Sequence, residues 1–163
     1  MDQAPAADFV ELVRPHLPAM SRLAARLAPD ADRDDVVQEA LARAWLKRDQ
    51  YSPDRGALSS WLLAITADQA GKARRRAGRA LRVIPAEPAT TDNDTAATVD
   101  AAMDVERALD RLTDRQRLAV DCVYYVGLTV AETAAVMGCA EGTVKSTLSD
   151  ARTRLRALLE VSP

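Results

Sequence analysis

Apolar residues recur at intervals of three and four along most of the chain, and this spacing predicts an all-α protein. The first apolar stripe spans residues 6–27, where Pro15 and Pro18 predict a kink or two consecutive helices. Later stripes predict helices over residues 35–47, from Leu58 onward and from residue 102. The positions expected to face a core include Phe9, Leu12, Val13, Leu17, Met20, Leu23, Leu27, Val36, Val37, Ala40, Leu41, Ala44, Leu58, Trp61, Leu62, Ile65, Val105, Ala108, Leu109, Leu112, Leu118, Val120, Val123, Tyr124 and Val126.

The most informative stretch is residues 128–159, which divides into a short helix, a turn and a longer helix. Thr129 and Glu132 predict a capping box at the start of the short helix. Gly138 suits a turn that needs a left-handed backbone, and the longer helix is expected to begin near Glu141. This is the helix-turn-helix arrangement, whose second helix can lie in the major groove of DNA. A plain helical hairpin in a bundle is the alternative. The longer helix is expected to bury Val144, Leu148, Ala151, Leu155 and Leu158 or Leu159.

Charge is distributed in blocks that the net value of −2 conceals. Residues 1–40 sum to −4, residues 41–84 to +7 and residues 85–110 to −6, and the remainder comes to +1. Alternating blocks of opposite sign indicate several different partners rather than one uniform nucleic-acid coat. Residues 84–101 are rich in Pro, Thr, Asp and Ala and have little apolar surface to bury, so they predict a linker between two domains.

Two polar clusters stand out as candidate binding surfaces. Lys72, Arg74, Arg75, Arg76, Arg79 and Arg82 have few nearby carboxylates to pair with. Such a stretch attracts phosphates through counterion release, although a solvated helix tail would have the same composition. Asp35, Gln38 and Glu39 are expected on one polar surface near the start of their helix, and a solvated face is again the alternative.

Several function classes lack support in the sequence. One histidine and two cysteines, Cys122 and Cys139, give no metal-ligand spacing, and the acidic run at residues 30–35 lacks the glycine and glutamate of a calcium loop. No nucleophile, base and metal cluster is present, so we expect neither an enzyme nor a cofactor. Two cysteines do not make a disulfide scaffold, so we expect a protein of the reducing cytoplasm. No apolar run approaches the length needed to cross a bilayer and the N-terminus does not resemble a signal peptide, so we expect no membrane insertion.

Two separated sets of motifs resemble the extracytoplasmic-function (group IV) sigma factors of bacterial RNA polymerase. The first is Asp-Asp-Val-Val-Gln-Glu-Ala at 34–40, with Ala44-Trp45 and then Trp-Leu-Leu-Ala-Ile at 61–65, and it resembles region 2 of the family. The second is Leu-Thr-Asp-Arg-Gln-Arg at 112–117, Gly-Leu-Thr-Val-Ala-Glu at 127–132 and Gly-Cys-Ala-Glu-Gly-Thr-Val-Lys-Ser at 138–146, and it resembles region 4. The resemblance covers nearly the whole chain except the linker.

The resemblance implies two small helical domains, over residues 1–83 and 102–163, joined by a flexible acidic linker over residues 84–101. It implies core RNA polymerase and promoter DNA as partners, and many relatives also bind an anti-sigma factor. Core polymerase would bind Asp35, Gln38 and Glu39. The −10 promoter element would bind Tyr51, Trp61, Asp68, Lys72, Arg74, Arg75 and Arg76. The −35 element would bind Thr143, Lys145, Ser146, Thr147, Ser149, Asp150 and Arg152.

The sequence departs from the family at positions that concern DNA readout. Relatives commonly have a basic residue at Thr147 and at Asp150, and an asparagine at Asp68. An aspartate is repelled by phosphates but can accept a hydrogen bond from a cytosine amino group. Ala140 stands where relatives often have a capping serine, which would weaken the helix start by about 1 kcal/mol. We therefore expect an altered −10 preference or weak promoter opening.

The sequence leaves two other interpretations open. A divergent sigma-like protein could bind core polymerase or a regulator without initiating well, as the acidic substitutions at Asp68 and Asp150 suggest. A stand-alone helix-turn-helix regulator is less well supported, because it leaves the acidic helix at residues 34–39 without a role.

Overall fold

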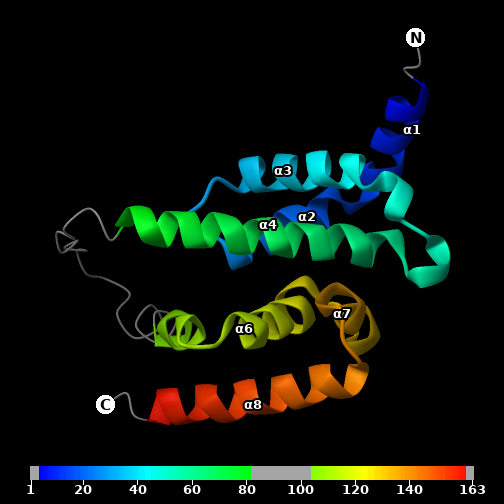
Figure 1. Cartoon of the computed structure of the whole chain (residues 1–163). Coiled ribbons are helices and arrows are strands. Elements are labelled where there is room, and N and C mark those ends of the chain that lie inside the picture. Colours follow the sequence, from blue (N-terminus) through cyan, green and yellow to red (C-terminus); the bar gives the residue numbers. More distant parts are fainter. Residues whose placement is uncertain (1–3, 82–103, 161–163) are drawn as a thin grey trace.

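The computed structural model describes residues 4–81 and 104–160, and the linker expected over 84–101 lies outside these ranges. Within the described residues every regular element is a helix, which confirms the all-α class (Figure 1). Residues 4–81 form an N-terminal unit and residues 104–160 form a C-terminal unit. The two units lie side by side, with α4 of the first facing α7 of the second (Figure 1).

The predicted break in the first helix is confirmed. α1 (Ala4–Val13) is followed by a short 3-10 helix, η1 (Arg14–His16), and then by α2 (Leu17–Leu27). The prolines lie at or near the starts of η1 and α2, where a missing amide donor does little harm. Because the chain turns at η1, α1 and α2 do not share one continuous stripe, and the prediction that Leu12 faces the core is wrong: it is 53% exposed.

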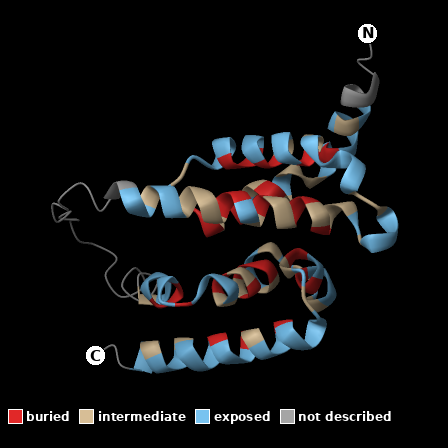
Figure 2. Ribbon diagram, in the orientation of Figure 1, coloured by how far each residue is buried: buried red, intermediate tan, exposed pale blue. Residues whose placement is uncertain are grey.

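The core of the N-terminal unit lies between three helices. α3 (Arg33–Leu46) begins at Asp32, whose carboxylate accepts hydrogen bonds from the amides of Asp34 at 2.8 Å and Asp35 at 3.2 Å. Two 3-10 turns, η2 (Arg48–Gln50) and η3 (Pro53–Arg55), lead into the long helix α4 (Leu58–Leu81). α2, α3 and α4 pack against one another, and their buried residues lie on the facing sides (Figure 2).

The C-terminal unit contains the predicted helix-turn-helix. Residues 104–110 are helical and are followed by α6 (Asp114–Val120), the π-helix η4 (Asp121–Val126), α7 (Val130–Met137) and α8 (Glu141–Glu160). Capping boxes start α6 and α7 as expected, and Gly127 and Gly138 end η4 and α7 with φ of 84° and 61°. α8 buries Val144, Leu148 and Ala151, while Leu155 and Leu158 are partly buried and Leu159 is 39% exposed. The prediction that Val105 faces the core is wrong: it lies in the first turn of the helix over residues 104–110 and is 43% exposed.

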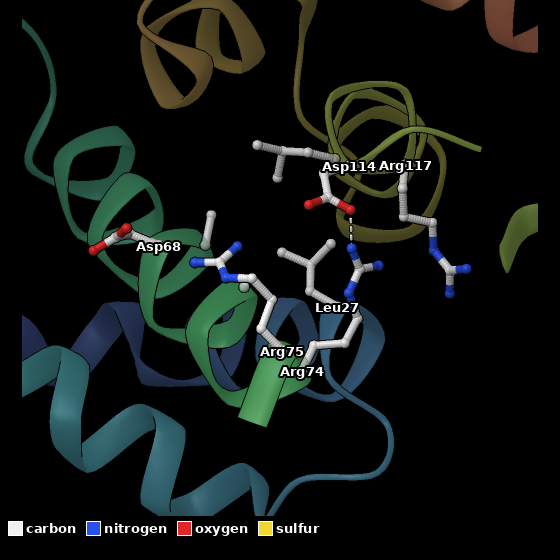
Figure 3. A pocket seen from close by; sticks show the side chains of 9 residues that line it. Leu27, Asp68, Arg74, Arg75, Asp114 and Arg117 are labelled. Carbon is white, nitrogen blue, oxygen red and sulfur yellow. Dashed lines mark hydrogen bonds and ion pairs between the residues drawn. The ribbon is translucent and has the colours of Figure 1, made fainter. Parts of the chain in front are cut away.

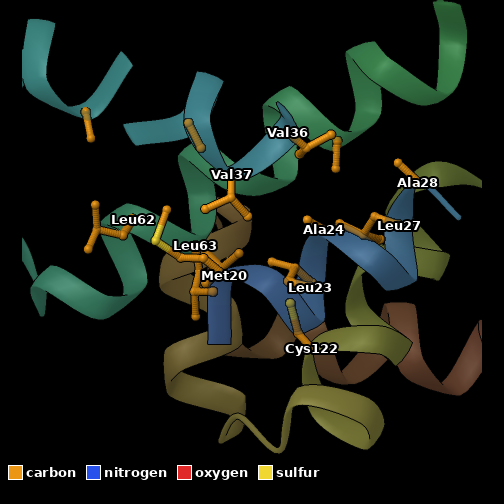
Figure 4. Packing of buried hydrophobic residues seen from close by; sticks show 14 of the residues in the cluster. Met20, Leu23, Ala24, Leu27, Ala28, Val36, Val37, Leu62, Leu63 and Cys122 are labelled. Atoms are coloured by element: carbon orange, nitrogen blue, oxygen red, sulfur yellow. The ribbon is translucent and has the colours of Figure 1, made fainter. Parts of the chain in front are cut away.

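The π-helix overturns one core prediction. A π turn contains more residues than an α turn, so it shifts the positions that follow to a different face of the helix. Tyr124 is consequently 61% exposed instead of filling the core, whereas Asp121 and Cys122 are buried at 1% and 0%. The side chain of Cys122 points toward Leu23 of α2 (Figure 4).

One hydrophobic cluster includes residues of both units. Buried residues of α2, α3 and α4 form most of it, and Cys122 of η4 and Val136 of α7 complete it (Figure 4). α2 packs against η4, and α4 packs against α7. The C-terminal unit therefore buries apolar side chains of its own against the N-terminal unit.

Candidate nucleic-acid interface

The second helix of the helix-turn-helix presents a polar face to solvent. Lys145, Ser149, Asp150 and Arg152 are all exposed, on the side of α8 away from the buried Val144. Neither Asp150 nor Lys145 forms an ion pair with another described residue, so both charges are available to a ligand. A face of this composition can reach base edges and phosphates in a major groove.

The hydroxyl groups near the start of α8 bond to the helix itself. Ser146 Oγ donates to the carbonyl oxygen of Thr143 at 3.0 Å, and Thr147 Oγ1 donates to the same oxygen at 2.7 Å. Thr147 is only partly exposed, whereas Thr143 and Ser146 are exposed. The side-chain hydrogen of each bonded hydroxyl is therefore in use, and its remaining lone pairs are free to accept a hydrogen bond.

An aromatic pair lines an open hollow beside the loop before α4. The rings of Tyr51 and Trp61 lie 5.3 Å apart between centroids, and Tyr51 Oη donates to the carbonyl oxygen of Gly56 at 3.4 Å. The hollow has a volume of about 290 Å³ and includes Arg55 and Ser60 in its wall. Ala135 of α7 also lines it, so the C-terminal unit borders this site.

Most of the predicted −10 residues that carry charge already have partners. Asp68 accepts a hydrogen bond from Lys72 Nζ at 2.7 Å, one helical turn away on α4. Arg74 forms an ion pair with Asp114 of the C-terminal unit (Figure 3). The two side chains line a small cavity between the units, together with Arg75 (Figure 3).

The aromatic and basic parts of this surface are separated along α4. Trp61 and Arg74 are thirteen residues apart, which places them roughly 20 Å apart along the helix axis at 1.5 Å per residue. A single nucleotide cannot contact both. An extended strand of several nucleotides could contact both.

The three residues expected to bind polymerase are exposed on one helix. Asp35, Gln38 and Glu39 lie on the outer side of α3, opposite the buried Val36, Val37 and Ala40. Glu39 approaches Arg76 of α4 at 3.8 Å, but both side chains are more than half exposed, so this ion pair contributes little to stability. Asp35 and Glu39 also line a shallow hollow between α3 and α4.

A buried ion-pair network between the units was not foreseen from the sequence. Arg26 Nε donates to Asp121 Oδ1 at 2.8 Å, and Arg117 Nε donates to Asp121 Oδ2 at 2.9 Å. Arg26 Nη1 also donates to Glu106 Oε1 at 2.6 Å. The spacing of Arg117 and Asp121 by four residues on a helix was a signal for their pair. Nothing in the sequence pointed to Arg26.

Burial and pairing oppose each other at this network. Burial raises the pKa of the Asp121 carboxyl, and the two neighbouring guanidinium groups offset only part of that effect. Burial acts to lower the pKa of Arg26, but its hydrogen bonds to Glu106 and Asp121 outweigh burial, so the net shift is upward. Burial, aided by the negative charge of Asp121, raises the pKa of the adjacent Cys122 thiol to about 12.

The described residues offer neither a metal-binding cluster nor a membrane-spanning helix. No group of three or more His, Cys, Asp or Glu side chains in residues 4–81 and 104–160 is placed to hold a metal ion. None of the helices in those ranges is both long and apolar enough to span a membrane.

Comparison with known proteins accounts for both units. Residues 12–80 match the model of Sigma-70 region 2, and residues 102–155 match that of Sigma-70 region 4. The chain is 40% identical over 154 residues to the ECF RNA polymerase sigma factor SigM of Mycobacterium tuberculosis, covering 93% of this chain and 76% of that one. It is 34% identical over 163 residues to SigL of the same species, covering 96% and 92%.

Solved structures agree with these matches. The sigma factor RpoE of Bartonella quintana, in complex with the anti-sigma factor NepR, aligns with a TM-score of 0.64 and 31% identity over 96% of this chain and 99% of that one. CnrH, in complex with the cytosolic domain of CnrY, aligns with a TM-score of 0.67 and 28% identity over 95% and 89%. The chain belongs to the extracytoplasmic-function sigma factors, the family that directs RNA polymerase to initiate transcription at specific promoters.

Proposed function

We propose that this chain binds core RNA polymerase through the outer face of α3 and selects promoters with two further surfaces. The −10 element would bind along α4 and the loop before it, and the −35 element would bind the exposed face of α8. This division corresponds to residues 1–83 and 102–163 as separate binding domains, joined by residues 84–101. Catalysis would belong to the polymerase, and the chain would act beside it in the cytoplasm.

The exposed acidic face of α3 is the observation that carries the polymerase-binding part. Asp35 and Glu39 lie one turn apart with Gln38 beside them, and the buried side of the same helix holds them in fixed positions. Two carboxylates on a rigid helix form a surface suited to a basic partner, because complementary charges steer association and fix its orientation.

The −10 proposal rests on the aromatic pair and the basic half of α4. Single-stranded DNA binds to cationic grooves whose aromatic side chains stack on bases. Tyr51 and Trp61 provide stacking surfaces beside an open hollow, and Lys72, Arg74, Arg75 and Arg76 follow along the same helix. Asp68, which takes the place of the family's asparagine, has only acceptor atoms and is bound to Lys72, so it would favour a base that donates.

The −35 proposal rests on the free face of α8. Lys145 and Arg152 would contact phosphates or guanine, and the exposed Asp150 would accept from a cytosine or adenine amino group. Thr143, Ser146, Thr147 and Ser149 complete the face.

Run-off transcription with purified core polymerase and fragmented genomic DNA tests the whole proposal. We expect the wild-type chain to yield discrete transcripts that core enzyme alone does not make. Failure of the chain to bind core polymerase in a pull-down would overturn it.

One observation favours a second function. Asp150, on the face of α8 that we propose binds DNA, and Asp68 on α4 are exposed acidic residues that would weaken contacts to phosphates. The chain would then be a divergent sigma-like protein that binds core polymerase and regulates it without efficient initiation. Core binding without transcripts from any genomic fragment would favour this reading. If the Asp150→Arg variant then gained affinity for duplex DNA, the charge would be identified as the cause.

A further inference from the structure

We propose that Arg76 belongs to the polymerase-binding surface of the chain, where it competes with a basic side chain of the polymerase for Glu39. The sequence groups Arg76 with the cations of α4 that would bind the −10 element. This inference rests on the proposed function, because it concerns the proposed contact with core polymerase, and it revises that function at one position.

Arg76 lies on the side of α4 that faces α3. Gln69, Ala73 and Arg76 line the hollow between these two helices, which has a volume of about 230 Å³. The three positions are spaced by four and three residues, so they form one stripe along α4. Glu39 of α3 lines the same hollow. The guanidinium of Arg76 is therefore beside the proposed polymerase-binding residues.

The proposed −10 surface follows a different stripe of α4. Ala64 lines the hollow that contains the aromatic pair. Asp68, Gly71 and Arg75 line the cavity between the units (Figure 3). Steps of four, three and four residues connect Ala64 to Arg75, so these positions share one side of the helix. Successive residues of an α-helix point about 100° apart. A DNA strand that follows this stripe would reach Arg75, whereas Arg76 is turned toward α3.

The surroundings of Arg76 are acidic. Its Nη1 lies 3.8 Å from Glu39 Oε1, and Asp32 and Asp35 line the same hollow. Both side chains of the pair between Arg76 and Glu39 are more than half exposed, so water and salt screen the attraction between them. Such a pair exchanges easily for a cation supplied by a partner. A basic side chain of the polymerase that binds Glu39 would have to displace Arg76.

Arg75 provides a matched comparison one residue earlier. It is exposed and forms no ion pair with another described residue. Substitution of either arginine by glutamine changes the net charge of the chain equally. Only the substitution of Arg76 removes a competitor for Glu39.

The test is the affinity of the labelled full chain for core polymerase, measured by fluorescence anisotropy. We expect Arg76→Gln to tighten binding about threefold, the size of effect expected from one exposed ion pair. Arg75→Gln should bind as the wild type does. The gain should shrink at about 1 M salt, because ions screen exposed charges at that concentration. A gain in affinity cannot be attributed to misfolding of the variant.

Glu39→Gln completes a double-mutant cycle with Arg76→Gln. In the Glu39→Gln background, Arg76→Gln should no longer tighten binding, because no carboxylate remains to be released. A gain that persisted in this background would show that Arg76 acts through net charge and would overturn the proposal.

Binding of a single-stranded −10 oligonucleotide by the holoenzyme tests the other half of the assignment. We expect Arg75→Gln to weaken this binding about threefold or more, because it removes a contact to phosphate, and Arg76→Gln to leave it unchanged. Equal losses in the two variants would return Arg76 to the DNA-binding surface and overturn the proposal.

The outcomes separate this inference from the proposed function. If the wild-type chain did not bind core polymerase, the proposed function would fail and this inference would fail with it. If the wild-type chain bound, and Arg76→Gln and Arg75→Gln had equal affinities for core polymerase, only the role of Arg76 would be overturned.

Discussion

The outer face of α3 and the basic half of α4 belong to the same N-terminal unit, yet they differ in what covers them. The α3 face presents Asp35, Gln38 and Glu39 to solvent. On α4, Arg74 is bound to Asp114 of the C-terminal unit and Lys72 is bound to Asp68. The proposed polymerase-binding face is therefore exposed, whereas Arg74 has to leave Asp114 before it can contact DNA.

The largest expected effect comes from substitutions on the exposed outer face of α3. We expect Asp35→Ala combined with Glu39→Ala to weaken binding to core polymerase about 100-fold, because residues at the centre of an interface each contribute about 1–2 kcal/mol or more. Thermal unfolding of the free chain should be unchanged, since both side chains are exposed. Fluorescence anisotropy with labelled chain measures the affinity.

Asp8→Ala combined with Glu11→Ala is the matched control, because it removes the same charge from exposed positions on α1. Equal losses in the two double variants would show that net charge matters and that the α3 face is not a specific contact.

Burial of the Cys122 thiol should make the stability of the chain depend on pH in the alkaline range. The Cys122 thiol has a pKa of about 12 in the folded chain, against an ordinary value near 8.5 for a thiol in the unfolded chain. Above pH 8.5 the unfolded chain loses this proton first, so the free energy of unfolding falls as pH rises. One such group contributes a slope of about 1.4 kcal/mol per pH unit.

Urea unfolding at pH 8.5, 9.5 and 10.5 measures this slope. We expect the free energy of unfolding of Cys122→Ala to fall less steeply with pH than that of wild type, by that amount. The slope of Cys139→Ala should match that of wild type. Parallel wild-type and Cys122→Ala curves would mean that the thiol is not held in an apolar environment.

A smaller effect is expected at the cap of α7, the helix that packs on α4. Thr129 Oγ1 accepts from the amide of Glu132, and Glu132 accepts from the amide of Thr129 at 2.8 Å. Thr129→Ala should lower the free energy of unfolding by about 1 kcal/mol, the usual effect of losing such a cap. Thr153→Ala removes an exposed hydroxyl that bonds only to its own helix, and chemical denaturation should show it near wild type. A neutral Thr129→Ala would argue against the capping box.

The smallest effect concerns a buried hydroxyl within α7. Among the described residues, Thr133 Oγ1 is fully buried and has no hydrogen-bond partner. Thr133→Val keeps the shape and removes the polar atom, so it should raise the free energy of unfolding by up to about 1 kcal/mol. Thr133→Ala, which also removes a methyl group, should be less stable than Thr133→Val. Destabilisation by valine would indicate a hydrogen bond that the hydroxyl makes in solution.

Local chemistry explains what could be predicted from the sequence. The prolines at 15 and 18, the two capping boxes and Gly138 act within a few residues of one another, so the elements they start or end are found at the expected places. The exposed faces of α3 and α8 followed from the same helical periodicity. These features need no knowledge of how the two units meet.

The contacts between the units could not be predicted in the same way. Arg26 and Asp121 are 95 residues apart, and no periodicity relates them. The π-helix exposes Tyr124 and buries Asp121, because its extra residue changes which side of the helix faces inward. Leu12 is exposed because the chain turns at η1. Each error arises where tertiary packing replaces a regular repeat.

Alkylation of Cys122 in the presence of core polymerase tests the central claim most directly. The account predicts that Cys122 is alkylated faster in the presence of core polymerase than in the free chain, because polymerase binding to α3 accompanies release of the C-terminal unit from α4. The Asp35→Ala and Glu39→Ala double variant should show no acceleration at the same polymerase concentration. A saturating amount of core polymerase that binds the wild-type chain and leaves Cys122 as protected as before would contradict the account.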